Sequence, residues 1–293
     1  MIMPATIEQC HLINFRKIPE IPANCTRIYF GHETCEKCLP AFDEIQDLLE
    51  AAEKRQIKLT YVTPFLSEKG LEDVQLFLFR LQSIRLTAFE ITSSDWGLLH
   101  WIKQNNVGTP VVSRFLTGQQ VDFRLSELRF MEEPPQSKES VIFFEGKYQQ
   151  LNRKRLSQAM IDHLSSCTLM KEKTIEIFIK SGITRFELSN VIQPVTLASN
   201  PQCHYSLHTP FVPLTIFRSC PEDLDFKHIK KACNAHNCNH SFQKWQSNNA
   251  RYDLYRIDNA LFYYHPDIEP AIFQNTRIDR IVYNDLKLAQ RYE

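Results

Sequence analysis

The sequence predicts an α/β protein built on a parallel β-sheet, either open or closed into a barrel. Two observations predict this fold. Three strand–helix units follow one another between residues 27 and 115, which is the order of elements that a parallel sheet requires. The chain has 293 residues, of which 43% are hydrophobic, so it holds enough apolar side chains for one large core.

The first unit begins with the apolar run Arg27–Phe30, which indicates a buried strand that ends at Gly31. Cys35 follows within a few residues of this strand. Pro40 then predicts a helix over residues 41–55, because a proline loses no hydrogen bond in the first turn of a helix. Since α/β folds place their chemistry at the carboxyl ends of their strands, Cys35 is a candidate site residue.

The pattern of strand and helix then repeats twice and ends on a further strand. Asp95 precedes the second of these helices, where its side chain is expected to cap the helix, and it is also a candidate catalytic residue. The expected elements are strands at 58–62, 88–92 and 111–115, with helices at 71–82 and 96–104.

Residues 117–170 break this pattern and form an irregular insertion or extension, in which a strand at 141–144 and a helix at 156–167 are expected. No linker composition flanks the segment, so we expect a single domain over residues 1–293. The elements expected beyond it are a helix at 173–180, strands at 185–188, 204–207 and 212–217, a hairpin of 252–256 with 260–264, a strand at 280–283 and a closing helix at 285–291.

The composition excludes several classes of function. The 34 basic and 34 acidic residues cancel, which argues against a broad nucleic-acid surface and leaves only a local basic groove open. No Gly-rich phosphate loop occurs, so a dinucleotide or nucleoside triphosphate site of the usual kind is not expected. The chain shows neither a signal peptide nor a run of about 20 apolar residues, so we expect a cytoplasmic protein with reduced thiols.

Three cysteines gather in the polar segment 220–240, at positions Cys220, Cys233 and Cys238. Thiols this close in a reducing compartment are typical of metal ligands. Cys220 follows an expected strand, as Cys35 does, and the carboxyl ends of parallel strands meet at one face. Cys35 therefore supplies the fourth thiolate that a four-iron cluster or a zinc ion requires.

Several alternatives stay open at this site. Cys38 competes with Cys35 as the ligand, and the two form a C-x-x-C sequence that could also be a redox pair. His236 and His240 stand beside Cys238 and could complete a zinc site. The remaining cysteines have no metal-binding spacing and are expected to be small buried side chains: Cys10, Cys25, Cys167 and Cys203.

Other candidates are polar residues near the expected strand ends. Arg218 precedes Cys220. It is expected to stabilise the negative charge of a cluster, to bind a carboxylate substrate or to form a structural ion pair. Glu187 stands between apolar neighbours on a strand and is a candidate acid or base. Tyr205 and His208 are further candidates.

Four segments, read together and in order, resemble the collagenase-like peptidase U32 family, and the cysteine arrangement is most similar to its UbiV-type iron–sulfur branch. The segments are 28–31, 94–97, 182–188 and 213–220. The resemblance spans residues 27–283 and implies a TIM-barrel-like β/α barrel. Only 26 residues precede Arg27, so the first strand–helix unit is expected to be truncated and the barrel incomplete or distorted.

The resemblance also implies a 4Fe–4S cluster held by Cys35, Cys220, Cys233 and Cys238. It implies oxygen-independent hydroxylation, or a related redox modification, of an aromatic or quinone precursor in ubiquinone biosynthesis or of an RNA base. A homologous protein of the same family is the expected partner in a heterodimer. No nucleophile–base arrangement supports peptidase activity, and His32 stands where the family often has glutamate.

Two other functions remain open from the sequence. The chain could be a non-catalytic, cluster-bearing partner subunit or electron-transfer module, whose companion subunit carries the substrate pocket. It could also be a structural protein stabilised by zinc, since zinc accepts the same thiolate ligands.

Overall fold

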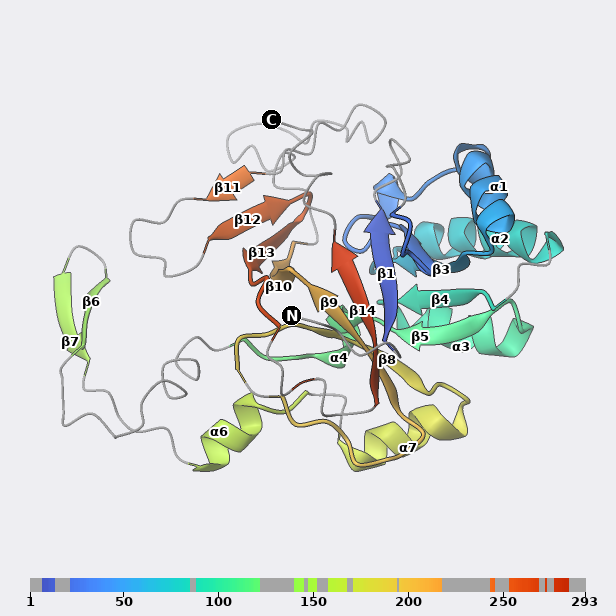
Figure 1. Cartoon of the computed structure of the whole chain (residues 1–293). Helices are drawn as coiled ribbons and strands as arrows, with labels where there is room; N and C mark the ends of the chain where they lie inside the picture. The colour runs from blue at the N-terminus through green and yellow to red at the C-terminus, as the bar shows by residue number, and fades with distance from the viewer. Residues whose placement is uncertain are drawn as a thin grey trace.

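The computed structural model describes residues 7–13, 22–84, 88–121, 140–144, 147–151, 158–167, 171–193, 195–217, 243–245, 253–268, 272 and 277–284. Its main feature is a closed barrel of parallel strands (Figure 1). Within the described residues, no helix is long and apolar enough to cross a membrane.

The barrel contains eight strands that neighbour one another in chain order. The last of them pairs in parallel with the first, so the ring closes. The strands are β1 (Glu8–Ile13), β2 (Arg27–Gly31), β3 (Lys58–Thr63), β4 (Glu90–Ser93), β5 (Thr109–Val112), β8 (Arg185–Ser189), β9 (His204–Thr209) and β14 (Ile278–Asn284). The predicted TIM-barrel-like fold is therefore confirmed, and the barrel is closed rather than open.

The first strand–helix unit was expected to be truncated, but its strand is present and completes the barrel. β1 fills that place, with Cys10 paired to Arg27 of β2 on one side and to Val282 of β14 on the other. Its sequence, E-Q-C-H-L-I, lacks the run of β-branched residues that predicts a strand. Neighbouring strands on both sides supply the pairing that the local sequence does not indicate.

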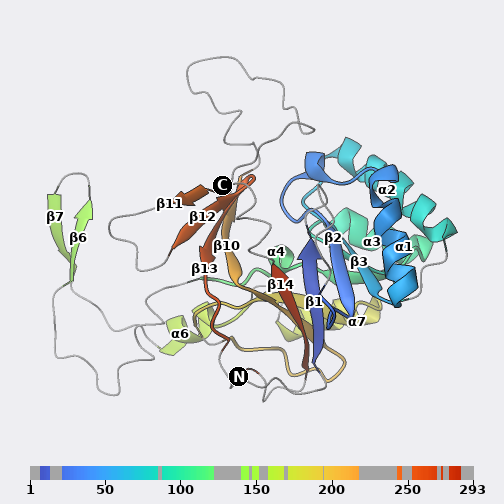
Figure 2. The ribbon, with the colours of Figure 1, turned by 45° about the horizontal axis from the view of Figure 1, so that its top comes forward.

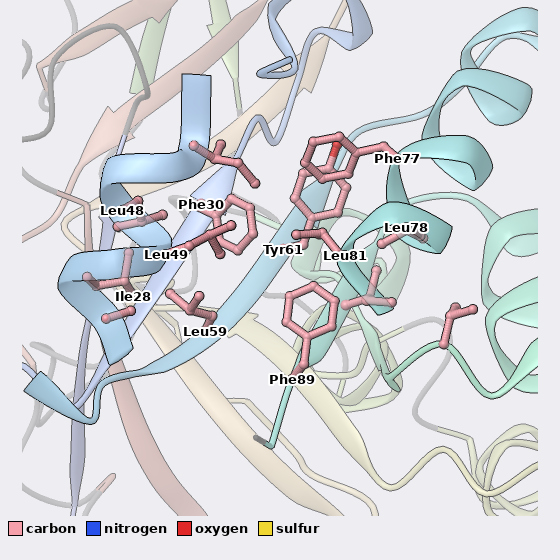
Figure 3. Packing of buried hydrophobic residues seen from close by; sticks show 14 of the residues in the cluster. Ile28, Phe30, Leu48, Leu49, Leu59, Tyr61, Phe77, Leu78, Leu81 and Phe89 are labelled. Carbon is pink, nitrogen blue, oxygen red and sulfur yellow. The ribbon is translucent and has the colours of Figure 1, made fainter. Parts of the chain in front are cut away.

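Three helices cover the outer face of β2 to β5: α1 (Gln46–Arg55), α2 (Glu68–Ser83) and α3 (Trp96–Asn105). Large apolar side chains fill the layer between them and the strands, among them Phe30 and Tyr61, which lie side by side with fully buried rings (Figure 3). Asp95 caps α3 as predicted, because its Oδ1 accepts a hydrogen bond of 2.9 Å from the amide of Leu98. A 3₁₀ turn at Asp43–Ile45 precedes α1, so this helix begins later than Pro40 indicated.

The segment after β5 differs from the prediction. The strand ends at Val112, and the short helix α4 (Arg114–Thr117) begins where a strand was expected to continue. Ser113 explains the change, because its side chain accepts a hydrogen bond from the amide of Phe115 at the start of α4. The elements described in the following insertion and before β8 are β6 (Ser140–Phe144), β7 (Lys147–Leu151), α6 (Gln158–Leu164) and α7 (Glu172–Lys180).

A second, antiparallel sheet lies beyond the end of the barrel toward which the strands point (Figures 1 and 2). It has the order β10 (Phe211–Ile216), β13 (Ala260–Tyr264), β12 (Leu254–Ile257) and β11 (Gln243–Trp245). The predicted hairpin is confirmed as β12 and β13. The strand expected at 212–217 exists, but it belongs to this sheet and not to the barrel. Pro213 suits that place, because an edge strand tolerates a residue without an N–H group.

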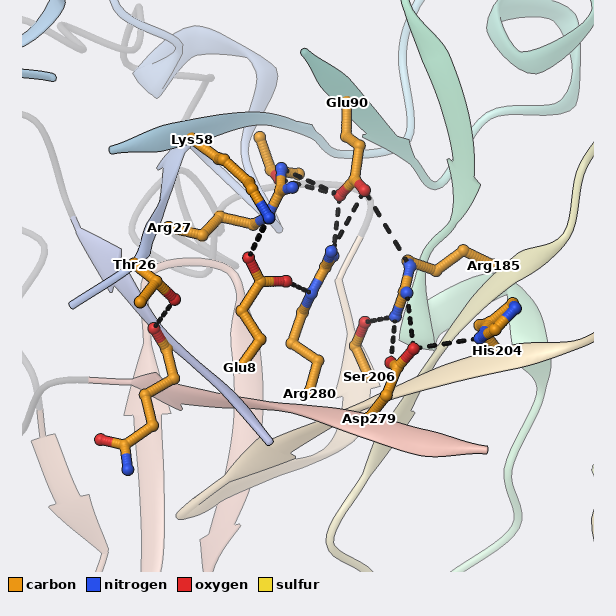
Figure 4. A network of polar contacts seen from close by, with 12 residues as sticks. Glu8, Thr26, Arg27, Lys58, Glu90, Arg185, His204, Ser206, Asp279 and Arg280 are labelled. Carbon is orange, nitrogen blue, oxygen red and sulfur yellow. Dashed lines mark hydrogen bonds and ion pairs between the residues drawn. The ribbon is translucent and has the colours of Figure 1, made fainter. Parts of the chain in front are cut away.

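A network of charged side chains closes the opposite, amino-terminal end of the barrel (Figure 4). Arg280 donates to Glu8 over 2.8 Å and to Glu90 over 2.7 Å. Arg185 donates two hydrogen bonds, of 2.7 and 3.0 Å, to the carboxylate of Asp279. Since these charges are paired with one another, we assign this end a structural role. Functional residues are expected at the carboxyl-terminal end of the strands.

Candidate functional site at the barrel mouth

The carboxyl ends of the barrel strands, together with the turn between β12 and β13, form a polar region that we call the barrel mouth. Its members are Gly31 at the end of β2 and the residues after it to Cys35, Arg114 after β5, Glu187 in β8, His208 in β9, and Asp258 with Asn259 in the turn. Gly31 ends β2 with a φ of 116°, a backbone conformation that favours glycine. A Cβ atom there would lie 2.2 Å from the carbonyl oxygen of Val62.

His32 connects the end of β2 to the second sheet. Its Nε2 lies 2.9 Å from Oδ2 of Asp258, and both side chains are buried. Its Nδ1 accepts a hydrogen bond of 3.0 Å from the amide of Cys35. The ring therefore carries its proton on Nε2 and donates it to Asp258. Burial alone lowers the pKa of His32, and the Asp258 carboxylate outweighs this effect and raises it.

Asn259 ties two distant segments together. Its Nδ2 donates to the carbonyl oxygen of Thr34 and to that of Phe217, each over 2.9 Å. The amide of Phe217 in turn donates to the carbonyl of Asn259 over 2.7 Å. The two carbonyl oxygens therefore lie within twice 2.9 Å of each other, although they are 183 positions apart in the sequence (217 minus 34).

Cys35 and Cys38 are half-buried and lie at the rim of the mouth. The pKa of the Cys35 thiol is lowered to about 6, mainly by a hydrogen bond from Cys38. Burial acts in the opposite direction and raises the pKa, while His32 lowers it further. A thiolate is the form of cysteine that binds metals. Within the described residues, no group of three or more metal-binding side chains occurs.

The other predicted ligands and their neighbours lie outside the described residues: Arg218, Cys220, Cys233, His236, Cys238 and His240. The cysteines expected to be small buried side chains are buried, as predicted: Cys10, Cys25, Cys167 and Cys203. Burial raises the pKa of the Cys167 thiol to about 12, which leaves it inert as a ligand at neutral pH.

Glu33 and Arg114 form a double hydrogen bond across the mouth. Nε and Nη2 of Arg114 donate to the two carboxylate oxygens over 2.9 and 2.6 Å. The third donor, Nη1, reaches the carbonyl of Phe211 in β10 over 2.6 Å. Burial alone raises the pKa of Glu33, but Arg114 and then His208 outweigh it, so the pKa lies below its ordinary value.

Beneath this pair, Glu187 and His208 meet inside the barrel. Nε2 of His208 lies 3.2 Å from Oε2 of Glu187, and both side chains are fully buried. The other oxygen of Glu187 accepts a hydrogen bond of 3.2 Å from Thr92. Nδ1 of His208 lies 3.9 Å from Oε1 of Glu33. The arrangement brings a carboxyl group and an imidazole together directly below the mouth.

The sequence identified some of these residues and missed others. It indicated Glu187 and His208 but not that they meet. It placed Arg114 in a strand and gave Glu33 and Asp258 no role, although the position of Glu33 just after β2 was a usable signal. Asp95 serves its helix as a cap, and Tyr205 packs in the apolar layer outside the barrel.

No protein-family model and no curated protein matches the chain. Among solved structures, "The Structure of the U32 Peptidase Mk0906" aligns with 97% of this chain and 95% of its own, at 10% identity and a TM-score of 0.42. The order and pairing of the strands define the barrel independently of this match. Membership of the U32 family stays a prediction from the sequence.

Proposed function

We propose that the chain is an iron–sulfur protein whose 4Fe–4S cluster is held at the barrel mouth by Cys35, Cys220, Cys233 and Cys238. The cluster would serve the oxygen-independent hydroxylation, or a related redox modification, of an aromatic or quinone precursor or of an RNA base. Hydroxylation removes electrons from the substrate, and a bound cluster would carry electrons one at a time between the substrate and a redox partner.

The observation that carries this proposal is the double hydrogen bond of Asn259. It holds the carbonyls of Thr34 and Phe217 together. Cys35 is the next residue after Thr34, and Cys220 is three positions beyond Phe217. Three residues of chain span at most about 10 Å. The sequence distance from this fixed point is one residue for Cys35 and three for Cys220, which supports the proposal that the two bind one cluster.

The chemistry of Cys35 supports the same proposal. Its low thiol pKa favours the thiolate, and its amide is held by His32, which is itself held by Asp258. The residue is half-buried, so a cluster bound there would be partly shielded from water. These residues fit a thiolate-bound metal group, and they fit zinc as well as iron.

The first experiment is to purify the chain without oxygen and to measure its visible absorption together with iron, sulfide and zinc. A broad absorption near about 400 nm, with about four irons and four sulfides per chain, is expected. A colourless protein with about one zinc would show that the site is structural. A protein without metal would refute both forms of the proposal.

Matched single substitutions then identify the ligands. Cys35→Ser is expected to lower iron and sulfide content, while Cys38→Ser keeps both; the reverse result would make Cys38 the ligand. Cys203→Ala is the control, because Cys203 is fully buried in the apolar layer outside the barrel. Co-purification with a homologous chain that carries the activity would favour the non-catalytic partner subunit over the enzyme.

A further inference from the structure

The buried pair of Glu187 and His208 carries an inference of its own. We propose that these two side chains hold one proton between them at neutral pH and form an acid–base pair that serves the barrel mouth. The substrate class that fits such a pair is a molecule whose reaction takes up a proton. The proposal depends only on the geometry of the barrel and stands with or without a cluster.

The first support is the burial of unsatisfied polar atoms. Both side chains are fully buried. Oε2 of Glu187 and both ring nitrogens of His208 make no well-aligned hydrogen bond within the described part of the chain. The hydroxyl of Thr92 is the donor that reaches the other oxygen of Glu187. A single hydrogen bond from a hydroxyl does not offset the free-energy cost of burying a charged carboxylate. A shared proton would remove that charge.

The second support is the count of charges around the pair. Above it, Glu33 and Arg114 neutralise each other through two hydrogen bonds. On the side of β14, the carboxylates of Glu8 and Glu90 are matched by the two guanidinium groups of Arg280 and Arg27.

Tyr29 lies between this lower network and the pair. Its hydroxyl accepts a hydrogen bond from Arg280, and its ring meets that of His208 edge-on with centroids 5.7 Å apart. With no proton, Glu187 and His208 would therefore leave one uncompensated negative charge in the interior. With one proton they are neutral together, either as a neutral acid beside a neutral imidazole or as a close ion pair.

The third support is the position of the pair relative to the mouth. His208 is the next-to-last residue of β9, at the end of the barrel where catalytic groups gather in this fold. Its Nδ1 faces Glu33 at 3.9 Å, and the side chain of Glu33 keeps 10% of its surface exposed. The proton thus lies one side chain below the surface of the mouth.

The chemical step balances simply. The proton passes from His208 to Glu33, and from Glu33 to an oxygen or nitrogen atom of the substrate, so that the buried pair is left with one negative charge. It then takes a proton from water at the mouth and returns to its neutral state. A general acid must lie within reach of the atom that it protonates, and the position of the pair below Glu33 meets that requirement.

The test is to locate this proton in the full-length chain. Protein labelled with ¹⁵N-histidine is titrated from about pH 5 to about pH 9, and the ring signals of His208 are assigned by their loss in His208→Gln. Infrared spectra of the same samples report any protonated carboxyl group. The expected result at pH 7 is either a charged His208 ring or a protonated carboxyl band that Glu187→Gln removes.

Glu187→Gln also separates the proposal from a merely structural pair. It should leave His208 neutral down to the lowest pH of the titration. The matched control is Asp279→Asn, which removes the carboxylate 3.0 Å from the half-exposed His204 at the opposite end of the barrel and should not move the His208 signals. A neutral His208 in the unaltered protein, with no carboxyl band assignable to Glu187, would overturn the proposal. That spectrum requires no variant to fold.

Discussion

Nε2 of His32 lies 2.9 Å from Oδ2 of Asp258, and this contact joins the barrel to the second sheet. The same ring accepts a hydrogen bond from the amide of Cys35. The turn between β12 and β13 therefore fixes the segment that carries the candidate ligand. A change in the turn is transmitted to Cys35 through one imidazole.

Asp258→Ala should destabilise the protein by about 2 to 4 kcal/mol, because it leaves a buried imidazole N–H without its charged acceptor. Urea unfolding measures the change. Asp253→Ala is the matched control on the same sheet. It removes an ion pair of 2.8 Å with Lys244 in which both side chains are largely exposed, so no measurable loss is expected. Equal effects of the two substitutions would contradict the role given to Asp258.

Asn259→Leu should separate the carbonyls of Thr34 and Phe217, because the side chain loses the donor that both share. A loss of about 1 to 3 kcal/mol in the free energy of unfolding is expected from the two unsatisfied carbonyls. If the proposed cluster spans these segments, iron content of the anaerobic protein should fall as well. Unchanged iron content in a destabilised variant would show that Asn259 supports only the fold.

The charge network at the closed end of the barrel should make stability depend on acid. Burial raises the pKa of Glu90, but Arg280, then Arg27 and Arg185, outweigh it and bring the pKa below the ordinary 4.5. The folded chain therefore binds this proton less readily than the unfolded chain does. The stabilisation is complete above the unfolded pKa and is lost as the pH falls through the folded one.

Glu90→Gln tests this dependence. Urea unfolding of the unaltered protein should show a steep loss of stability below about pH 4.5, and the variant should show a shallower one. Arg280→Met should cost about 2 to 4 kcal/mol at pH 7, because the part-buried carboxylates of Glu8 and Glu90 lose one of the two guanidinium groups that they share. Parallel acid curves for Glu90→Gln and the unaltered protein would refute the assignment.

Gly31→Ala should destabilise the protein by about 2 to 4 kcal/mol, because the added methyl group meets the backbone of Val62 and the φ of 116° disfavours alanine. Gly97→Ala is the control in α3. Its added carbon would lie 3.1 Å from a side-chain oxygen of Asp95, at an ordinary helical φ, so a change below about 1 kcal/mol is expected. Thermal unfolding that ranks the two variants the other way would contradict the strain at Gly31.

The sequence by itself determined the elements whose signals are local. Each of these signals spans only a short stretch of sequence, and the structure contains all of the predicted features. They are the apolar runs of β2 and β3, the helical period of α2 and the cap at Asp95. These signals persist because local backbone preference and one-sided burial act over a turn or a strand. The regular alternation of these elements also sufficed to predict the parallel sheet.

Only the tertiary structure decided what converges at the mouth. β1 has no local signal and exists through its pairing with β2 and β14, at opposite ends of the chain. Glu33 follows β2, whereas Glu187 and His208 lie in β8 and β9. Their side chains meet because the closed barrel and its strand register place the carboxyl ends of these strands at the same height. The partner of His32 comes from a turn more than 200 positions away. Such contacts depend on long-range register, which no window of the sequence contains.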